Sequence, residues 1–273
     1  MLRQSQAKNN GWGKPMQWAR LEHDGRTRFG IIAADVLRVH DGDMFAGARP
    51  SGETIPLADC RWLTPMLPSK MICLWNNFHQ AALKHGLAIP AEPLTFIKSA
   101  NSFNAHRQKI EQPLSYPGRV VFEGELGVVI GRRCKAVDVA QAADCIFGYT
   151  CVNDVTAIEL IGRDASFAQW SRAKNFDGFG VFGPVIATQI DPLQGNLRTL
   201  LNGRERQNYP LSDMIFSPAE LVSRISQDMT LLPGDLIACG TSLGVLPMQP
   251  GMTIEVIVDG IGTLSNDYGS LAS

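Results

Sequence analysis

Two glutamates, Glu123 and Glu125, are separated by a single residue in a strand-like run that extends from Val120 to Ile130. Because the side chains of a strand alternate between its two faces, both carboxylates project from one side, while Phe122 and Val128 project from the other. Carboxylates this close repel each other and raise each other's pKa unless a cation lies between them. The spacing therefore indicates a metal ion or a shared proton, against the plainer alternative of a solvated strand face that carries two glutamates.

A third acid, Asp154, follows the apolar strand predicted over residues 149–153 and opens a helical stretch that begins at Thr156. An acid at such a position is often only a helix cap. Together with Glu123 and Glu125, however, Asp154 would complete an all-carboxylate site of the kind that magnesium, manganese or calcium prefers. The remaining coordination positions would be left to water or substrate, so such a site could be catalytic.

The composition argues against several classes of partner. Of the 273 residues, 25 are basic and 26 are acidic, so the net charge is −1, and like charges do not cluster. This balance disfavours a surface for nucleic acid or for an anionic membrane. The polar run from Met1 to Gly13 shows no signal peptide or anchor, and no later stretch reaches the ~18 apolar residues of a membrane span. We therefore expect a cytoplasmic protein that binds neither nucleic acid nor a membrane.

The cysteines do not have the spacing of a zinc site. No Cys-x-x-Cys pair occurs and several cysteines lie in apolar segments, so buried free thiols are expected rather than zinc ligands or disulfides. The six are Cys60, Cys73, Cys134, Cys145, Cys151 and Cys239.

The chain divides into two predicted units. Residues 1–68 contain short strands and turns, including a turn at Asp24-Gly25, and a series of prolines ends this segment at Pro68. Residues 69–273 are predicted to form a larger, mostly β unit that helices interrupt. The expected fold class is therefore α+β, mostly β, with a small β-rich N-terminal domain.

The clearest helix of the larger unit begins at Ser217. This capping serine is followed by a proline at the first helical position and by Glu220 three residues after the cap. Further helices are predicted over residues 139–146 and 156–161. A hairpin with an Asp-Gly turn is predicted over residues 253–264.

Several short motifs, taken in their order and spacing, resemble the fumarylacetoacetate hydrolase family. Each motif is weak alone, but together they extend from about Lys70 to Asn266 and are highly specific. The resemblance implies a mixed β-sandwich roll, a homodimer, and Mg²⁺ or Mn²⁺ on Glu123, Glu125 and Asp154. The matching segments are Glu123 to Gly131, Gly148 to Ala157, Arg172 to Asp177, Gly183-Pro184, Asn202-Gly203, Met214 to Leu221, Leu232 to Asp235, Gly240-Thr241 and Gly260 to Gly262.

The resemblance also implies a chemistry. Family substrates are 2-oxo acids with a second carbonyl or enol, and a divalent ion chelated by such a substrate can stabilise the enolate formed when a C–C bond breaks or a proton moves. Lys174 matches the lysine of a family Lys-x-Phe-Asp element and would place a positive charge beside the developing oxyanion. On its own, Lys174 would be interpreted as a surface lysine or as the ion-pair partner of Asp177. Gly240 and Thr241 match a family Gly-Thr turn that could hold a substrate carboxylate, unless Gly240 only ends a strand.

A first departure from the family lies in a lid element. Many family hydrolases carry Asn-Tyr-x-x-His-x-x-Glu there, and its histidine and glutamate activate a water. Aligned from Asn76, this chain has Gln80 at the histidine position and Leu83 at the glutamate position. His79 stands one residue earlier and either replaces the missing histidine or only forms a local hydrogen bond. The isomerase and decarboxylase of homoprotocatechuate meta-cleavage form a related branch that is similar in carrying glutamine at this lid position.

A second departure follows Asp154. Many members have Ser-Ala-Arg-Asp there, but in this chain Ile158 stands in place of the arginine, which could engage the substrate carboxylate. Arg172 or Lys98 could compensate, although both could also be solvated charges.

Three functions therefore remain open. The first is the isomerisation or decarboxylation of a 2-oxo or 2-hydroxydienoic acid from aromatic degradation. The second is the hydrolysis of a C–C bond in an acylpyruvate or fumarylpyruvate with the help of His79, and the third is a non-catalytic, metal-stabilised binding protein. The candidate site residues are Lys174, His79 and Gln80 for catalysis, Gly240, Thr241, Arg172 and Lys98 for a small-molecule oxo-acid substrate, and Glu123, Glu125 and Asp154 for the metal.

Overall fold

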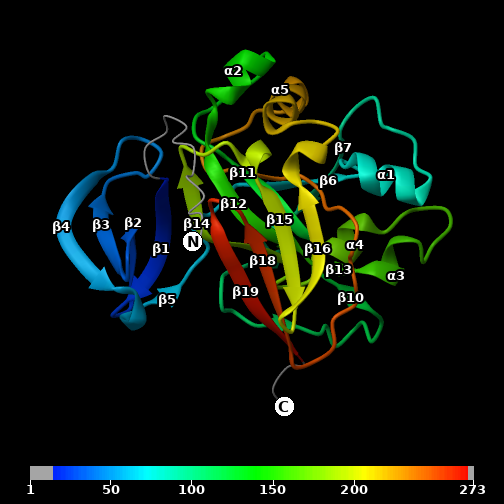
Figure 1. Cartoon of the computed structure of the whole chain (residues 1–273), viewed down its shortest axis with the longest axis horizontal. Coiled ribbons are helices and arrows are strands. Elements are labelled where there is room, and N and C mark those ends of the chain that lie inside the picture. Colours follow the sequence, from blue (N-terminus) through cyan, green and yellow to red (C-terminus); the bar gives the residue numbers. More distant parts are fainter. Residues whose placement is uncertain (1–14, 270–273) are drawn as a thin grey trace, which may run out of the picture.

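The computed structural model describes residues 15–269 and shows a mostly β fold with few helices (Figure 1). The predicted polar run at the start of the chain lies outside the described residues. The strands of the described part are β1 (Met16–His23), β2 (Arg26–Ala33), β3 (Val36–Asp41), β4 (Arg49–Pro56), β5 (Arg61–Trp62), β6 (Met71–Trp75), β7 (Leu94–Lys98), β8 (Phe103–Asn104), β9 (Ile110–Glu111), β10 (Val120–Val121), β11 (Gly124–Ile130), β12 (Ile146–Asp154), β13 (Thr156–Ala157), β14 (Gly180–Thr188), β15 (Asn196–Leu201), β16 (Arg204–Pro210), β17 (Leu236–Ala238), β18 (Met252–Val258) and β19 (Gly262–Gly269). The α-helices are α1 (His79–His85), α2 (Val139–Ala143), α3 (Ile158–Ile161), α4 (Trp170–Lys174) and α5 (Pro218–Asp228).

Two sheets are stacked on each other. The larger has the strand order β4-β3-β2-β1-β14-β12-β11-β17-β6-β7, with β5 beside β1 and β8 beside β14, and the smaller has the order β16-β15-β18-β19-β9. Strands β18 and β19 lie against β12 and β14, and β15 lies against β11 (Figure 1). The predicted mostly β, sandwich-like fold class is confirmed.

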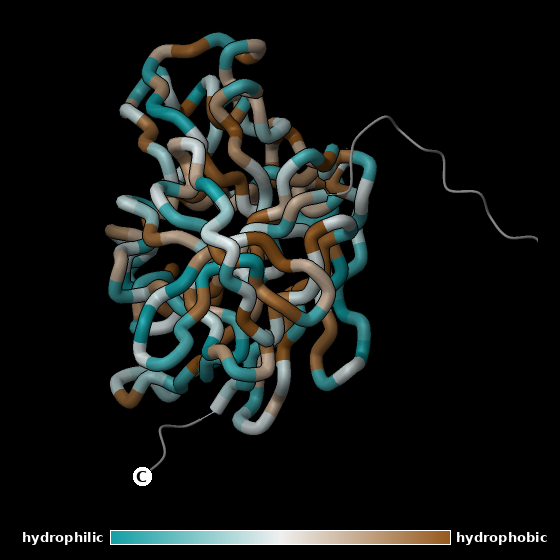
Figure 2. Tube along the Cα trace, turned by 90° about the vertical axis from the view of Figure 1, so that its left-hand side faces the viewer, coloured by the Kyte–Doolittle hydropathy of each residue, from teal (hydrophilic) through white to brown (hydrophobic). Residues whose placement is uncertain are grey.

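The hydrophobic core lies between these sheets. Val128 and Cys151 from the larger sheet are buried with Leu197, Val256 and Leu264 from the smaller one. Inward and outward side chains alternate along each strand, so the opposite face of the larger sheet has a second buried cluster of its own. Figure 2 shows hydrophobic stretches gathered in the middle of the molecule.

The N-terminal strands extend the larger sheet. Strand β1 pairs with β14 in antiparallel fashion, so that Trp18 lies opposite Ile186. The predicted turn between β1 and β2 is confirmed, and both Asp24 and Gly25 have positive φ angles. The predicted domain boundary at Pro68 stays a prediction.

The predicted helices and hairpin are confirmed in part. Helix α5 has the predicted capping box, in which Ser217 and Glu220 bond each other's backbone. The helix predicted over residues 139–146 is shorter than expected, because β12 already begins at Ile146. The helix predicted over 156–161 is also shorter, since its first two residues form β13. The hairpin is confirmed and is longer than predicted.

The predicted continuous strand from Val120 to Ile130 was wrong. It breaks between β10, which pairs with β13, and β11, which pairs with β12. At the break, the Glu123 N–H donates to the Asn153 side chain, and the Glu123 carbonyl accepts from the Asp154 N–H. The backbone N–H and C=O of Glu123 are therefore hydrogen-bonded although Glu123 lies outside the regular strand pairing. The chain can turn there while both glutamates remain at one site.

Two further expectations concern the cysteines and the membrane. All six cysteines are free thiols, and all except the half-buried Cys60 are buried, as predicted. Within residues 15–269, every helix is too short or too polar to cross a membrane.

His106 makes the stability of the fold depend on pH. Its Nδ1 accepts the backbone N–H of Ser265 at 3.0 Å, and its ring packs edge-on against Trp62. Burial, with the charge of Arg107, lowers the pKa of His106 from 6.5 to about 4. The unfolded chain takes up this proton as the pH falls below about 6.5, whereas the folded protein does so only near pH 4.

The free energy of unfolding should therefore decrease as the pH falls from 7 to 4, by about 2 kcal/mol from this residue. Urea denaturation across this range measures the slope. The variant His106→Gln should lose most of this contribution, and an unchanged slope in the variant would contradict the assignment.

Candidate metal centre and active site

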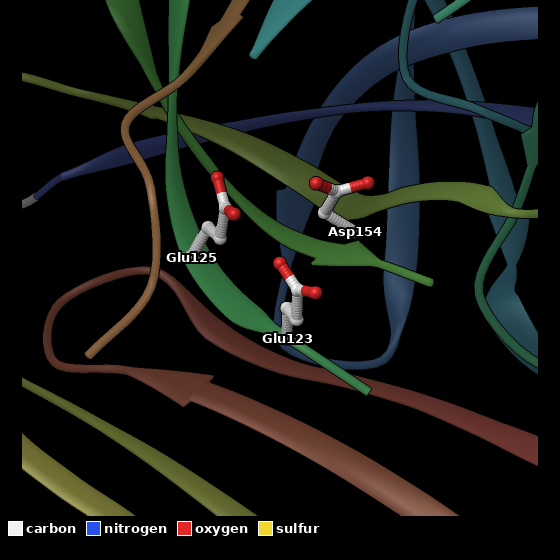
Figure 3. A group of neighbouring side chains, drawn as sticks. All are labelled: Glu123, Glu125 and Asp154. Carbon is white, nitrogen blue, oxygen red and sulfur yellow. The ribbon is translucent and has the colours of Figure 1, made fainter. Parts of the chain in front are cut away.

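Glu123, Glu125 and Asp154 converge on one small space (Figure 3). One carboxylate oxygen of each lies within 4.8 Å of those of the other two. The antiparallel register of β11 and β12 brings them together, because Gly124 pairs with Asn153. Two of the three carboxylates are buried, and Glu123 keeps 14% of its side chain exposed. We call these three residues the acid cluster.

Two buried lysines contact the acid cluster. The Lys174 Nζ donates to Asp154 Oδ2 at 2.5 Å and to Glu123 Oε2 at 3.0 Å. The Lys98 Nζ donates to Asp154 Oδ1, also at 2.5 Å. Lys174 is therefore neither a surface lysine nor the partner of Asp177, and Lys98 is not a solvated charge.

The electrostatics of the cluster are set by burial and by these ion pairs. Burial disfavours the charge of Lys174, but Asp154 and Glu123 outweigh it and raise the pKa of Lys174. Burial also opposes the charge of Asp154, yet the two lysines hold the pKa of Asp154 below its usual value. Burial raises the pKa of Glu123 despite Lys174. The pKa of Glu125 is raised well above its usual range by burial and by the two neighbouring carboxylates.

The hydrogen bonds of Glu123 and Glu125 indicate whether the acid cluster could hold a cation. Both oxygens of Glu123 are used, since Oε1 accepts the Thr156 hydroxyl and Oε2 accepts Lys174. Glu125 Oε2 accepts the Gly240 N–H at 2.8 Å, but its buried Oε1 has no hydrogen-bond partner among the described residues. Such an orphaned buried oxygen is costly unless an ion or a proton occupies it. Because all the potential metal ligands of the cluster are carboxylate oxygens, the site fits a hard divalent cation such as Mg²⁺ or Mn²⁺.

A cavity of about 240 Å³ adjoins the cluster. Glu123 and Lys174 line it together with mostly apolar and aromatic side chains. The other lining residues are Leu74, Trp75, Asn76, Ala81, His85, Leu87, Phe96, Ile158, Ile161, Trp170, Thr241, Ser242 and Val245. They come from β6, α1, β7, α3, α4 and the segment after β17, which gather on the side of the molecule away from β4 (Figure 1).

Helix α1 presents other residues to this cavity than those predicted. His79 and Gln80 are exposed and do not line it, whereas Ala81 and His85, one helical turn apart, do. The structure favours an alignment of the lid element from Asn77, because the buried Phe78 then takes the place of the family tyrosine. In that register, Ala81 stands at the position of the family histidine.

The glutamate position of the lid element is then occupied by Lys84. The His and Glu pair is therefore absent in either register. The sequence allowed both because two asparagines are adjacent.

Of the other residues predicted to bind the substrate, some line the cavity and some do not. Thr241 lines the cavity, while its hydroxyl donates to the Gly124 carbonyl at 2.8 Å. The N–H of Gly240 is already bonded to Glu125, so in this geometry it is not offered to a substrate. Arg172 is exposed and does not line the cavity, so the missing arginine is not replaced there. The substrate-binding roles of these residues stay predictions.

Sequence reasoning missed most of the cavity wall. His85 belongs to no sequence motif that we recognised. Its spacing of four residues from Ala81, however, places both on one helix face. Trp75, Phe96 and Trp170 come from three separate segments, and nothing in their local sequence shows that they meet.

Two protein families match the chain. The family described as "Fumarylacetoacetate (FAA) hydrolase C-terminal" matches residues 70–268. A second family, described as "Rv2993c-like, N-terminal", matches residues 16–65.

Individual relatives are similar over most of the chain. Protein Rv2993c of Mycobacterium tuberculosis is 43% identical over 219 residues, which cover 79% of this chain and 81% of that protein. Oxaloacetate tautomerase YisK of Bacillus subtilis is 37% identical, with coverage of 74% and 70%. The crystal structure of 2-hydroxyhepta-2,4-diene-1,7-dioate isomerase from Mycobacterium marinum is 37% identical, covers 94% of this chain and 100% of that chain, and superposes with a TM-score of 0.86.

Proposed function

Because the chain belongs to the fumarylacetoacetate hydrolase family, we propose that it is a divalent-metal-dependent enzyme that isomerises or decarboxylates a 2-oxo or 2-hydroxydienoic acid of aromatic degradation. The observation that carries this proposal is the acid cluster, with its orphaned Glu125 oxygen, beside a cavity whose lid element lacks the His and Glu pair of the family hydrolases. Relatives named as an isomerase and a tautomerase support chemistry that moves protons rather than adds water.

The residues around the cavity suit such a reaction. A cation held by the acid cluster would supply Lewis-acid stabilisation of negative charge on the substrate oxygens. Among the described contacts, Lys174 uses two of its three N–H donors on Asp154 and Glu123, which leaves one for a substrate oxygen. Lys98 does not line the cavity, and it orients Asp154 from within the core. The apolar lining keeps water away from the reacting carbons.

We propose His85 as the residue that moves the proton. It is the only histidine among the described residues that line the cavity, and histidine is the side chain most often used for this task. In an isomerisation, its imidazole would take a proton from one carbon of the substrate and return it to another. After a decarboxylation, it would deliver a proton to the carbon that has lost CO₂.

His85 and His79 lie on the same helix and form a matched pair for the test. His85→Gln should lower kcat for an oxo acid by about 10²-fold or more, as expected for the loss of a general acid or base. His79→Gln should leave kcat near the wild-type value, because its exposed side chain does not reach the cavity. The assay follows the enol absorbance and the pyruvate release of oxaloacetate, acetylpyruvate and fumarylpyruvate in the presence of Mg²⁺.

Two other functions make different predictions in this assay. Rapid release of pyruvate from acetylpyruvate or fumarylpyruvate that disappears in His79→Gln, but not in His85→Gln, would favour a C–C hydrolase. Failure to turn over any oxo acid, with intact binding of the metal and of the ligands, would favour a non-catalytic binding protein. The homodimer that the family resemblance implied stays a proposal, and so does the cytoplasmic location expected from the sequence.

A further inference from the structure

The cavity carries charge at one end only. Glu123 of the acid cluster and its partner Lys174 line this end. Among the other described residues that line it, His85 is the only side chain that can carry a charge. A substrate whose oxo-acid end lies at the cluster therefore directs its remaining atoms, the tail, into a nearly uncharged space.

Aromatic rings form one continuous wall of this space. The ring of Trp170 stacks on Phe96 at a centroid distance of 5.3 Å and meets Trp75 edge-on at 6.1 Å. The wall begins beside the acid cluster, because the Lys174 Nζ lies 4.9 Å from the centroid of the Phe96 ring. It ends at the surface, where Trp75 is 41% exposed.

Aliphatic side chains form another part of the lining, which also includes the polar but uncharged Asn76, Thr241 and Ser242. Ile158 and Ile161 come from α3, and Leu87 follows α1. Ile158 occupies the place where the family resemblance led us to expect an arginine. A residue type that pairs with a substrate carboxylate is therefore missing at this position.

We infer that the site selects 2-oxo acids whose tail is uncharged, apolar and planar, such as an aryl or alkenyl group. This inference rests on the proposed function, because it places the oxo-acid end at the acid cluster. A flat tail can stack on the ring of Trp170 and buries apolar surface there. A tail carboxylate would instead lose water without gaining an ion-pair partner from the aromatic or aliphatic wall.

Phenylpyruvate and 2-oxoglutarate are suitable probes, since they share the 2-oxo carboxylate and differ in the tail. Their dissociation constants for the full-length protein with Mg²⁺ can be measured by calorimetry and by quenching of tryptophan fluorescence. We expect phenylpyruvate to bind at least about tenfold more tightly. Trp170→Ala, and also the milder Trp170→Leu, should reduce this preference by about fivefold or more.

The variants Ile158→Arg and Ile158→Lys should shift the preference toward 2-oxoglutarate by about tenfold or more, because each supplies the missing cation. Phe167→Ala is the matched control: Phe167 lies between α3 and α4, is 70% exposed and does not line the cavity, so both dissociation constants should be unchanged.

Three results would overturn the inference. The wild-type protein could bind both probes with equal affinity, it could bind 2-oxoglutarate more tightly, or both Trp170 variants could keep the wild-type preference. So would the absence of binding of either probe to protein that has bound Mg²⁺. Retention of the metal and turnover of acetylpyruvate, whose tail is uncharged, are measured separately. A tail preference without turnover would therefore count against the proposed catalysis and not against the selectivity.

Discussion

Replacing Glu125 by glutamine should abolish high-affinity binding of a divalent cation and lower kcat for an oxo acid by about 10³-fold or more, or ~4 kcal/mol. Glutamine keeps the shape of the side chain and can still accept the Gly240 N–H, but it removes the negative charge that has no lysine partner. The cation-free variant should be at least as stable as the wild-type protein. The reason is the raised pKa of Glu125 in the folded state.

The sign of this stability effect follows from proton linkage. An unfolded glutamate loses its proton near pH 4.5, whereas folded Glu125 keeps its proton to higher pH, so ionisation at neutral pH disfavours the cation-free folded state. Glutamine does not ionise and avoids this cost.

Thermal unfolding with and without Mg²⁺ or Mn²⁺, together with calorimetric titration, measures both effects. At a cation concentration of 100 times Kd, the wild-type protein should gain about 2.7 kcal/mol, and Glu125→Gln should gain nothing. Glu205→Gln, an exposed change on β16, is the control and should behave as the wild type. A cation-dependent gain that persists in Glu125→Gln would contradict the proposed metal centre.

Replacing Lys174 by methionine should cost both stability and activity. Without Lys174, Glu123 loses its only lysine partner among residues 15–269, and Asp154 keeps one of its two there. An uncompensated buried charge costs about 3–5 kcal/mol. We expect kcat to fall by about 10³-fold, because the donor that faces the cavity is lost. Divalent cations should restore part of the stability, since they neutralise the same carboxylates, but they should not restore kcat.

Lys98→Met separates the two effects. It should destabilise the protein by a similar amount, because Asp154 again loses a partner, while kcat falls less, since Lys98 does not line the cavity. Lys70→Met controls for the loss of an ion pair elsewhere, because Lys70 pairs with Asp235 and does not line the cavity. Chemical denaturation and steady-state kinetics on the three variants provide the comparison. A wild-type kcat in Lys174→Met would show that this ammonium group takes no part in the reaction.

The acid cluster could be predicted from the sequence because its geometry depends on local rules. Alternation in an assumed continuous strand predicted Glu123 and Glu125 on one side, and the end of the next strand predicted Asp154 nearby. The cluster forms although Glu123 lies just before β11 rather than within it. The break in the strand at Glu123 was not predictable, because it depends on hydrogen bonds to Asn153 and Asp154 in the neighbouring strand.

The cavity wall was beyond local rules for a different reason. Trp75, Phe96 and Trp170 come from three separate segments, and only the folded chain brings their rings together. The faces of α1 were assigned from a motif whose starting asparagine was ambiguous, and a shift of one residue turns a helix by about 100°. That shift exchanged Gln80 for Ala81 in the cavity.

The order of strands in the larger sheet has a consequence for how copies of this protein can meet. Its outer strand β4 carries two prolines and a glycine and is almost entirely exposed, features that discourage another strand from adding to it. At the opposite end, the Asn175 side chain that follows α4 bonds the Ile97 carbonyl of β7 and so covers part of that edge. Both borders of the sheet thus resist extension by a foreign strand, which favours contact through side chains over continuation of the sheet between molecules.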